Sequence, residues 1–438
     1  MSVKATRKRI GIREFKDVVF FLFLFLVSAI TVYISFFPLK PVVYWIGGYV
    51  IDLTIPTVFA AFFSLYLSLG WVWYAVSGFV CSFIKRGKLK ENDDPDFKFS
   101  ILIAAHNEEN VISNILSDLK NQTYRNFEAI VICHNCTDRT YEVVCELSKG
   151  NPWIKPIKFL GEYGKPHALN YGVKFASGEL ITVFDADSRI DKDYLEKVTR
   201  YFPKYDGVQT LIQASNPNYN VLTQLIDLEY VCYTDLVQYS RSGMGFNAIF
   251  GGTGQTIKRE VLENVGFWDT DLVEDYSLSV KVTLKDYKVA YTTDTKVYDE
   301  KVPFWKPFFK QRARWLRGDY QITKKYLSKA WRKPDYLHLL FSAFGILFYI
   351  YSYFCVMVYL FGGQVIQFYF PTTVWLPLFL IQQSVAITRI GITRGIKKIC
   401  YYPLLFLYIY HWIPALFYTP FVKTWKESKT PHGFFTTR

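Results

Sequence analysis

The stretch Glu179–Ser188 reads ELITVFDADS, a short apolar run that ends in two aspartates, Asp185 and Asp187. An apolar run of this length predicts a buried strand. Residues two apart at the end of a strand lie on the same face, so both carboxylates can point toward one place. A hard divalent cation prefers carboxylate oxygens and completes its shell with substrate phosphates. The pair therefore predicts a Mg²⁺ or Mn²⁺ site, although aspartates are also common in solvated turns.

Apolar runs of strand length alternate with segments of helical periodicity around this stretch. The expected strands are Phe99–Ala105, Phe127–Cys133, Pro156–Leu160 and the run that ends at Asp185. The expected helices are Val111–Leu119, Tyr141–Ser148 and His167–Phe175. Fully apolar strands that alternate with helices are typical of a largely parallel sheet covered on both faces. Ligands bind such α/β sheets at the carboxyl ends of the strands, so we expect the site at that edge.

Long apolar runs flank this polar centre. Of the 438 residues, 51% are hydrophobic and 19% aromatic, which is high for a soluble protein. The runs long enough to cross a bilayer are Val18–Phe37, Ile55–Ile84, Leu337–Phe361, Val365–Ile387 and approximately Ile399–Val422. The expected organisation is a membrane region with two transmembrane helices over residues 1–90, a water-facing domain over 91–303, interfacial amphipathic helices over 304–335 and a membrane region with about three apolar segments over 336–438.

Basic residues gather at the edges of these runs, in a chain whose formal net charge is +13. They include Arg7, Lys8, Arg9, Arg13, Lys16, Lys85, Arg86, Lys88, Lys90, Arg389, Arg394, Lys397 and Lys398. This placement favours membrane lipids as partners and argues against nucleic acid. The positive-inside rule then predicts an integral membrane protein with its central domain in the cytoplasm.

The last apolar run fits this topology less well. Three crossings after the central domain would place the basic C-terminal residues outside, against the same rule. Because the run carries Pro403, Pro414 and Pro420, it is either re-entrant or wrongly bounded at one end. The seven cysteines are scattered and give no disulfide framework.

A second acidic pair, Glu274 and Asp275, occurs in LVEDYSLSVKV, where apolar residues at helical spacing predict a helix start. Carboxylates at a helix start can be simple caps. The glycine-rich turn that precedes them, with Gly251, Gly252 and Gly254, lets the backbone approach a ligand closely. A carboxylate near such a turn can accept a proton from an incoming hydroxyl, which makes this pair a candidate general base.

The stretch Phe308–Gly318 reads FFKQRARWLRG and mixes arginines with aromatic residues just before an apolar run. This pattern predicts an amphipathic helix at a membrane surface. For Phe308, Phe309 and Lys310, a purely lipid-facing role is the simpler interpretation.

Five motifs, SILIAAHNEENV, GKPHALNYG, FDADS, VEDYSL and QRARW, occur in this order along the chain. Their order and approximate spacing resemble those of the membrane-integrated family 2 glycosyltransferases, which include cellulose, hyaluronan and poly-N-acetylglucosamine synthases and ceramide glucosyltransferase. The resemblance covers nearly the whole chain. It implies a glycosyltransferase-A-type (Rossmann-like) α/β domain in the cytoplasm, with interfacial helices and an α-helical transmembrane region.

The resemblance also implies roles for individual residues. Asp185 and Asp187 would hold the divalent cation and the donor, and Asp275 would be the catalytic base, next to Glu274. The implied donor-side residues further include Lys165, Glu108 and His134. Gln311, Arg314 and Trp315 match a QxxRW motif that would contact the acceptor and the diphosphate.

The chain departs from the family pattern in the turn after the second strand. His134 stands where an aspartate usually contacts uracil, so either His134 or Asp138 is expected to contact the base. Cys133 and Cys136 in the same turn form a lone C-x-x-C, which indicates packing and not zinc binding.

The implied reaction is an inverting transfer of a sugar from a nucleotide-diphosphate sugar, UDP-glucose or UDP-N-acetylglucosamine, to an acceptor hydroxyl in β linkage. The acceptor is either a growing glycan, as in a processive polysaccharide synthase, or a membrane lipid, as in a glycolipid synthase. The third alternative is a transport or scaffold protein without catalysis.

Overall fold

The computed structural model describes residues 43–46, 49–52, 69–70, 72–83, 96–330 and 372–422. The chain divides into two compact units, Met1–Trp73 with Tyr326–Ser384 and Tyr74–Lys325 with Val385–Arg438. In the first unit, β1 (Val43–Ile46) and β2 (Tyr49–Asp52) pair antiparallel. The second unit holds every candidate site residue.

The second unit is built on a mixed sheet with the strand order β5-β4-β3-β6-β9-β8-β10-β7. Its strands are β3 (Phe99–Ala105), β4 (Phe127–His134), β5 (Ile154–Phe159), β6 (Leu180–Asp185), β7 (Arg189–Ile190), β8 (Gly207–Ala214), β9 (Gln255–Lys258) and β10 (Val289–Asp299). The first four strands of the order are parallel, as predicted. Strand β9 runs antiparallel to its neighbours β6 and β8, and β7 runs antiparallel to β10, so the whole sheet is mixed.

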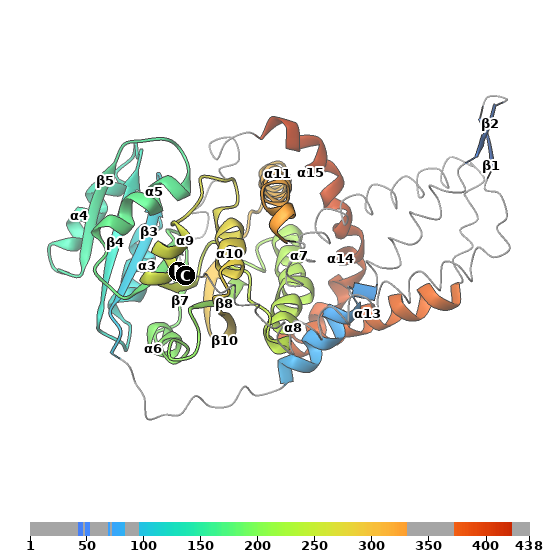
Figure 1. The fold of residues 1–438 in the computed structure, drawn as a ribbon, viewed down its shortest axis with the longest axis horizontal. Helices are drawn as coiled ribbons and strands as arrows, with labels where there is room; N and C mark the ends of the chain where they lie inside the picture. Colours follow the sequence, from blue (N-terminus) through green and yellow to red (C-terminus); the bar gives the residue numbers. More distant parts are fainter. Residues whose placement is uncertain are drawn as a thin grey trace, which may run out of the picture. The chain divides into compact units, whose positions relative to one another are not determined.

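Side chains alternate across β3 into two cores. Phe99, Ile101 and Ile103 face the core that includes residues of α3 (Ile112–Lys120), α4 (Thr140–Ser148) and α6 (Tyr194–Thr199). Leu102 faces the opposite core, with α5 (Lys165–Gly172), α9 (Arg259–Val265) and α10 (Glu274–Leu284). Helices therefore cover both faces of the sheet (Figure 1), which explains why its central strands are apolar throughout.

Strand register places the polar turns on one edge of the sheet. Asp185 at the end of β6 lies opposite Ala104 of β3, and Cys133 of β4 lies opposite Ala105. Strand β10 pairs parallel with β8 and ends at Asp299. The carboxyl ends of these strands converge, as expected for a ligand site of an α/β sheet.

A further helical layer packs beside the sheet (Figure 1). It contains α7 (Val221–Glu229), a π-helical turn η2 (Tyr230–Thr234), α8 (Asp235–Met244) and those parts of α11 (Trp305–Ala330) and α13 (Thr372–Arg394) that belong to the second unit. Residues of α7, η2, α11, α13 and α14 (Tyr402–Tyr408) share one apolar cluster. Phe308 is fully buried in that cluster, so the lipid-facing interpretation is wrong for this residue.

The last predicted apolar run is a series of short helices. Their bounds are η4 (Ile396–Tyr401), α14 (Tyr402–Tyr408), η5 (Ile409–His411), α15 (Trp412–Tyr418) and η6 (Thr419–Phe421). Pro403, Pro414 and Pro420 each lie within the first three residues of one piece, where a missing N–H is tolerated.

Among the helices that the structure describes, none is both long and apolar enough to span a bilayer. The runs Val18–Phe37 and Leu337–Phe361 lie outside the described residues, as do large parts of Ile55–Ile84 and Val365–Ile387.

Arg389 and Arg394, which are predicted to flank a membrane segment, pair with carboxylates of α8 and α7. Arg394 contacts Asp227 through two hydrogen bonds, Nε to Oδ2 at 2.6 Å and Nη2 to Oδ1 at 3.0 Å. Arg389 Nη2 donates to Asp235 Oδ2 at 2.7 Å. Both aspartates are buried, so each requires a cation nearby. Hydropathy at a segment edge could not show that the partners lie far away in the sequence.

Candidate active site

Three carboxylates meet at the carboxyl edge of the sheet. Asp185 and Asp187 follow β6, Asp299 ends β10, and one oxygen of each lies within 4.8 Å of the others. Oxygen ligands at this spacing fit a hard divalent cation. The two predicted residues therefore come together, and a third joins them that the sequence did not single out.

Lys165 connects this cluster to the glycine-rich turn. It is the first residue of α5, and its ammonium group donates to Asp185 Oδ1 and, at 2.8 Å, to the carbonyl oxygen of Gly252. Burial lowers the pKa of Lys165, but the charge of Asp185, followed by that of Glu274, outweighs burial and raises the pKa above its usual value. The lysine therefore stays a cation among carboxylates.

Glu274 and Asp275 form the first turn of α10 behind the same glycine. No side-chain hydrogen bond caps the helix at Val273, and Asp275 Oδ1 accepts from the N–H of Tyr276 at 2.8 Å. Gly252 has φ +79°, and a Cβ there would lie 3.2 Å from Asp275 Oδ2. The turn thus brings backbone directly against the acid pair, and simple capping does not account for Glu274, which is buried.

Burial is the main influence on the protonation of this pair. It raises the pKa of Asp275. It also raises the pKa of Glu274 to about 8, with the charge of Asp275 adding to the effect, while Lys165 and Arg314 oppose it. Burial thus favours the protonated form of each carboxyl more than water would.

Helix α11 packs against the residues that precede α10. Arg314 Nη1 donates to the carbonyl oxygen of Leu272 at 2.7 Å. One turn later, a Cβ on Gly318 would lie 2.5 Å from Val273, so only glycine allows this approach. Asp319 follows, and burial raises its pKa to about 7, with a further contribution from Asp275.

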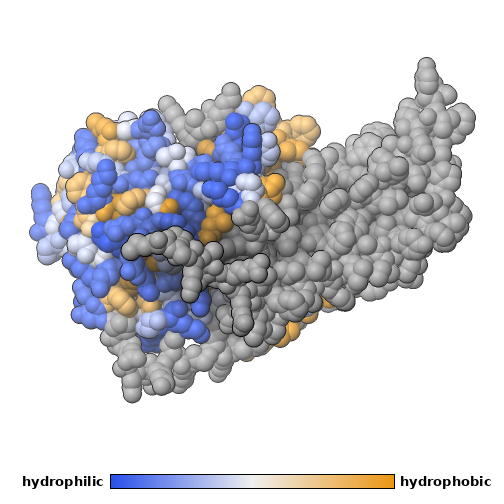
Figure 2. All heavy atoms as spheres, in the orientation of Figure 1, coloured by the Kyte–Doolittle hydropathy of each residue, from blue (hydrophilic) through white to orange (hydrophobic). Residues whose placement is uncertain are grey.

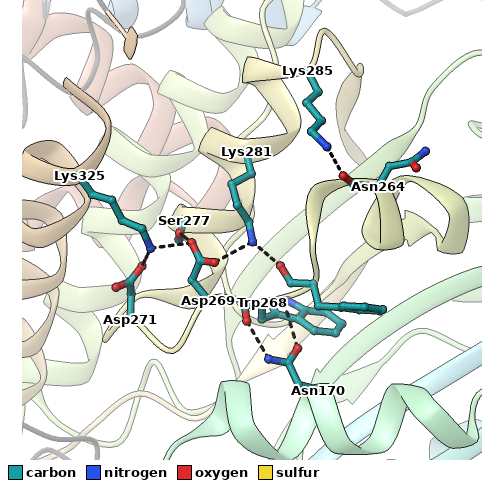
Figure 3. Close-up of polar contacts among 10 residues, drawn as sticks. Asn170, Asn264, Trp268, Asp269, Asp271, Ser277, Lys281, Lys285 and Lys325 are labelled. Carbon is teal, nitrogen blue, oxygen red and sulfur yellow. Dashed lines mark hydrogen bonds and ion pairs between the residues drawn. The ribbon is translucent and has the colours of Figure 1, made fainter. Parts of the chain in front are cut away.

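Figure 3 shows the loop before α10 held by ion pairs from two helices. The Asp269 carboxylate accepts from Ser277 at 2.6 Å, from Lys281 of α10 at 2.9 Å and from Lys325 of α11 at 2.9 Å. Lys325 also contacts Asp271 at 2.9 Å. These contacts fix the loop, and with it the position of the acid pair.

Asp138 and His134, which are expected to contact the nucleobase, both make contacts within the chain. Asp138 Oδ1 accepts from the N–H of Thr140 at 3.0 Å and from its hydroxyl at 2.6 Å, and Oδ2 accepts from the N–H of Glu109 at 3.2 Å. Its acceptors are thus engaged in joining two turns. His134 is buried and stacks on Phe159 with ring centroids 5.1 Å apart. Burial lowers its pKa, so it is a neutral imidazole at physiological pH.

The other predicted residues lie on the surrounding elements. The backbone N–H of Glu108 donates to Thr140 Oγ1 at 2.8 Å, in the same pair of turns as His134. Gln311 and Trp315 are half-buried on α11, one helical turn apart. The thiol of Cys133 lies in the core and Cys136 packs against it, as predicted.

Sequence reasoning missed Asp299, Lys301 and Asp319. Lys301 Nζ contacts Asp299 Oδ2 at 2.9 Å. The stretch VYDEK at the end of β10 also places acids at a strand end, but the residues before it, TTDTK, are polar, so it gives a much weaker signal for Asp299 than VFDADS gives for Asp185. Asp319 lies four residues after Trp315, a spacing that places the two side chains on the same side of a helix.

Comparison with known proteins gives consistent results. Residues 95–318 match the family described as "Glycosyltransferase like family 2". The chain is 28% identical over 365 residues to "Probable glycosyltransferase YdaM" of Bacillus subtilis (strain 168), covering 77% of this chain and 85% of the relative. It is 26% identical over 317 residues to "Poly-beta-1,6-N-acetyl-D-glucosamine synthase" of Staphylococcus epidermidis, covering 69% and 75%.

Among solved structures, the mannosyltransferase PcManGT from Pyrobaculum calidifontis, in complex with GDP-Man and Mn²⁺, is similar in fold. The TM-score is 0.56 at 18% identity, and the match covers 84% of this chain and 98% of that one. The mixed sheet is accordingly that of the glycosyltransferase-A-type α/β fold.

The raised pKa of Glu274 predicts a pH-dependent stability. Between its ordinary value of 4.5 and about 8, the native protein keeps a proton that the unfolded chain has released, so stability falls as pH rises. Glu274→Gln removes this dependence. The free energy of unfolding of the variant, relative to that of wild type, should therefore rise by up to about 1.4 kcal/mol per pH unit over this range. Denaturant unfolding at pH 5 to 8 measures it. Glu263→Gln, at an exposed position, should follow wild type, and parallel curves for Glu274→Gln would contradict the assignment.

Proposed function

The chain belongs to glycosyltransferase family 2, and from that premise we propose that it is a membrane-embedded, metal-dependent, inverting enzyme. In this proposal it builds a β-linked polysaccharide from a nucleotide-diphosphate sugar. The observation that carries the proposal is the junction of three groups at one edge of the sheet. These are the carboxylates around Asp185, the cation of Lys165 and the acid pair that includes Asp275. They are the cation ligands, the diphosphate contact and the base that a single displacement needs.

In the proposed reaction, the acceptor hydroxyl oxygen attacks the anomeric carbon of the donor as the bond from that carbon to the diphosphate oxygen breaks. Asp275 takes the hydroxyl proton, because it is the acid whose carboxylate faces Gly252 next to Lys165. The electron pair of the breaking bond leaves on the diphosphate, where Arg314 and Lys165 balance the charge. One displacement inverts the anomeric configuration.

The fit of a cation is supported by the three clustered carboxylates. Asp185, Asp187 and Asp299 would hold Mg²⁺ or Mn²⁺. When bound, the ion would neutralise negative charge on the diphosphate. The PcManGT structure, which contains Mn²⁺, shares the fold.

Two observations support the donor and the product. The Staphylococcus epidermidis relative is named as a poly-β-1,6-N-acetylglucosamine synthase, which makes UDP-N-acetylglucosamine the first donor to test, ahead of UDP-glucose. Trp315 is half-buried at the turn that follows Gln311, where an exposed part of its ring would receive the end of the glycan.

We also propose that the protein is integral to the cell membrane, with its catalytic unit on the cytoplasmic side. The long apolar runs and the basic residues beside the first two support this location. Large apolar side chains on the C-terminal helices are exposed, among them Leu407 (63%), Phe417 (71%) and Phe421 (75%). Figure 2 shows hydrophobic residues near α15, while hydrophilic residues predominate over the sheet and its helices.

Removing the base should stop transfer without preventing donor binding. Asp275→Asn keeps the shape of the side chain but loses its proton affinity, so kcat should fall by about 10²- to 10⁴-fold. Binding of UDP-N-acetylglucosamine, measured by calorimetry with Mn²⁺, should persist. Asp193→Asn, at a surface pair with Lys197, is the matched control. Normal turnover by Asp275→Asn would exclude it as the base.

The third carboxylate should matter for the cation. Asp299→Asn should raise the Mn²⁺ concentration needed for half-maximal turnover by at least about tenfold. Asp294→Asn, on the same strand but exposed, should leave that concentration unchanged. Equal cation dependence in both variants would remove Asp299 from the cation site.

Product size tests the polysaccharide assignment. Purified protein in nanodiscs, given UDP-N-acetylglucosamine, Mn²⁺ and membrane lipids, should release nucleoside diphosphate and form a labelled polymer that gel filtration resolves. A single labelled lipid would instead identify a glycolipid synthase. Absence of sugar transfer from a panel of nucleotide sugars would favour a non-catalytic scaffold.

A further inference from the structure

Arg312 is an arginine of α11 that lies inside the QxxRW motif but is not one of its specified residues. Its side chain is buried, in contrast to those of Gln311 and Trp315, which are half-buried on the same helix. A buried guanidinium is costly unless its hydrogen bonds and charge are satisfied, so its surroundings indicate what holds it there.

The hydrogen-bond partners of Arg312 are a carboxylate and a phenol. Its Nη2 donates to Glu229 Oε2 and, at 3.4 Å, to the hydroxyl of Tyr408. The same hydroxyl donates to Glu229 Oε2 at 2.8 Å. Glu229, the last residue of α7, is itself buried. The carboxylate and the phenol thereby hold the guanidinium at Nη2.

Arg312 also lies over three aromatic rings. Its Cζ lies 4.2 Å from the ring centre of Trp315, 4.9 Å from that of Phe308 and 5.3 Å from that of Trp412. A guanidinium over a ring within about 6 Å is attracted by the negative face of the ring. The indole of Trp315 thus packs on a cation that is held by a carboxylate of α7.

The same end of α7 also contacts the acidic cluster. Tyr230 follows Glu229 and opens the π-helical turn, and its ring centre lies 3.8 Å from Lys301 Nζ. Lys301 pairs with Asp299 at 2.9 Å. Two adjacent residues therefore connect the support of Trp315 to the carboxylates that would hold the cation.

We propose that Arg312 is a positioning residue that sets the plane of the Trp315 indole, and thereby the binding of the acceptor sugar, through its fixed contacts with Glu229 and Tyr408. This inference rests on the proposed function, in which Trp315 receives the acceptor. Arg312 does not contact the reacting atoms in this proposal. It should therefore affect acceptor binding more than donor binding.

The chain contains a matched control for the cost of disturbing a buried arginine. Arg389 pairs with the buried Asp235, which also accepts from the hydroxyl of Tyr291, and its Cζ lies 5.2 Å from the ring of Tyr239. This is again an arginine, a carboxylate, a tyrosine and a ring, but on α13 and α8. Arg389→Lys should weaken the fold in the same way as Arg312→Lys without disturbing Trp315.

The experiment compares wild type, Arg312→Lys, Arg389→Lys and Trp315→Ala in nanodiscs. Release of nucleoside diphosphate from UDP-N-acetylglucosamine is measured against the concentration of added N-acetylglucosamine as acceptor, and melting temperature is measured in parallel. Lysine keeps the charge but has no planar group to stack, so Arg312→Lys should raise the acceptor KM about tenfold and leave the donor KM within about twofold. Arg389→Lys should lower the melting temperature and leave both KM values unchanged.

Equal changes of the acceptor KM in Arg312→Lys and Arg389→Lys, or an unchanged acceptor KM in Arg312→Lys, would overturn the proposal. If wild type releases no nucleoside diphosphate, the donor assignment fails instead. Binding of N-acetylglucosamine, followed by saturation-transfer NMR, then decides the role of Arg312. A signal that Trp315→Ala and Arg312→Lys lose and Arg389→Lys keeps supports it. A signal that Arg312→Lys retains, or no signal from wild type, overturns it.

Discussion

The ammonium group of Lys165 is the contact on which the site depends. Carboxylates crowded at the edge of a sheet repel one another, and those of Glu274 and Asp275 are also removed from water. Lys165 lies among them, bonded to Asp185 and to the carbonyl of Gly252. One cation thus connects strand β6, which ends at Asp185, with the turn at Gly252 that faces Asp275. Without this positive charge, the carboxylates would repel one another more strongly.

Helix α11 provides the second constraint, because three of its residues determine where α10 begins. Arg314 bonds to Leu272, Gly318 allows contact with Val273, and Lys325 pairs with both aspartates of the preceding loop. Glu274 and Asp275 are therefore positioned by a helix that follows later in the sequence. A motif that looks like a surface pattern in the sequence is, in the fold, part of the support for the acid pair.

Local patterns were sufficient to predict the four parallel strands, their helices and the pair Asp185 and Asp187, because alternation and strand ends are properties of short segments. The glycine-rich turn and the helix start indicated the pair Glu274 and Asp275, and family resemblance assigned roles to Asp275 and Lys165, which the structure brings to the same edge. Contacts that depend on distant partners could not be predicted. The buried aspartates that pair with Arg389 and Arg394 lie over 150 residues earlier, and the helix-start contacts of Asp138 cannot be read from composition.

The π-helical turn Tyr230–Thr234 changes the direction in which side chains point between two ion pairs, Glu229 with Arg312 and Asp235 with Arg389. An α-helix rotates by about 100° per residue, and a π-helical turn accommodates one extra residue. Glu229 before the turn faces Arg312, and Asp235 after it faces Arg389. Deletion of one residue here would rotate Asp235 away from its arginine while Glu229 kept its own. The length of this segment is therefore constrained more strictly than its composition.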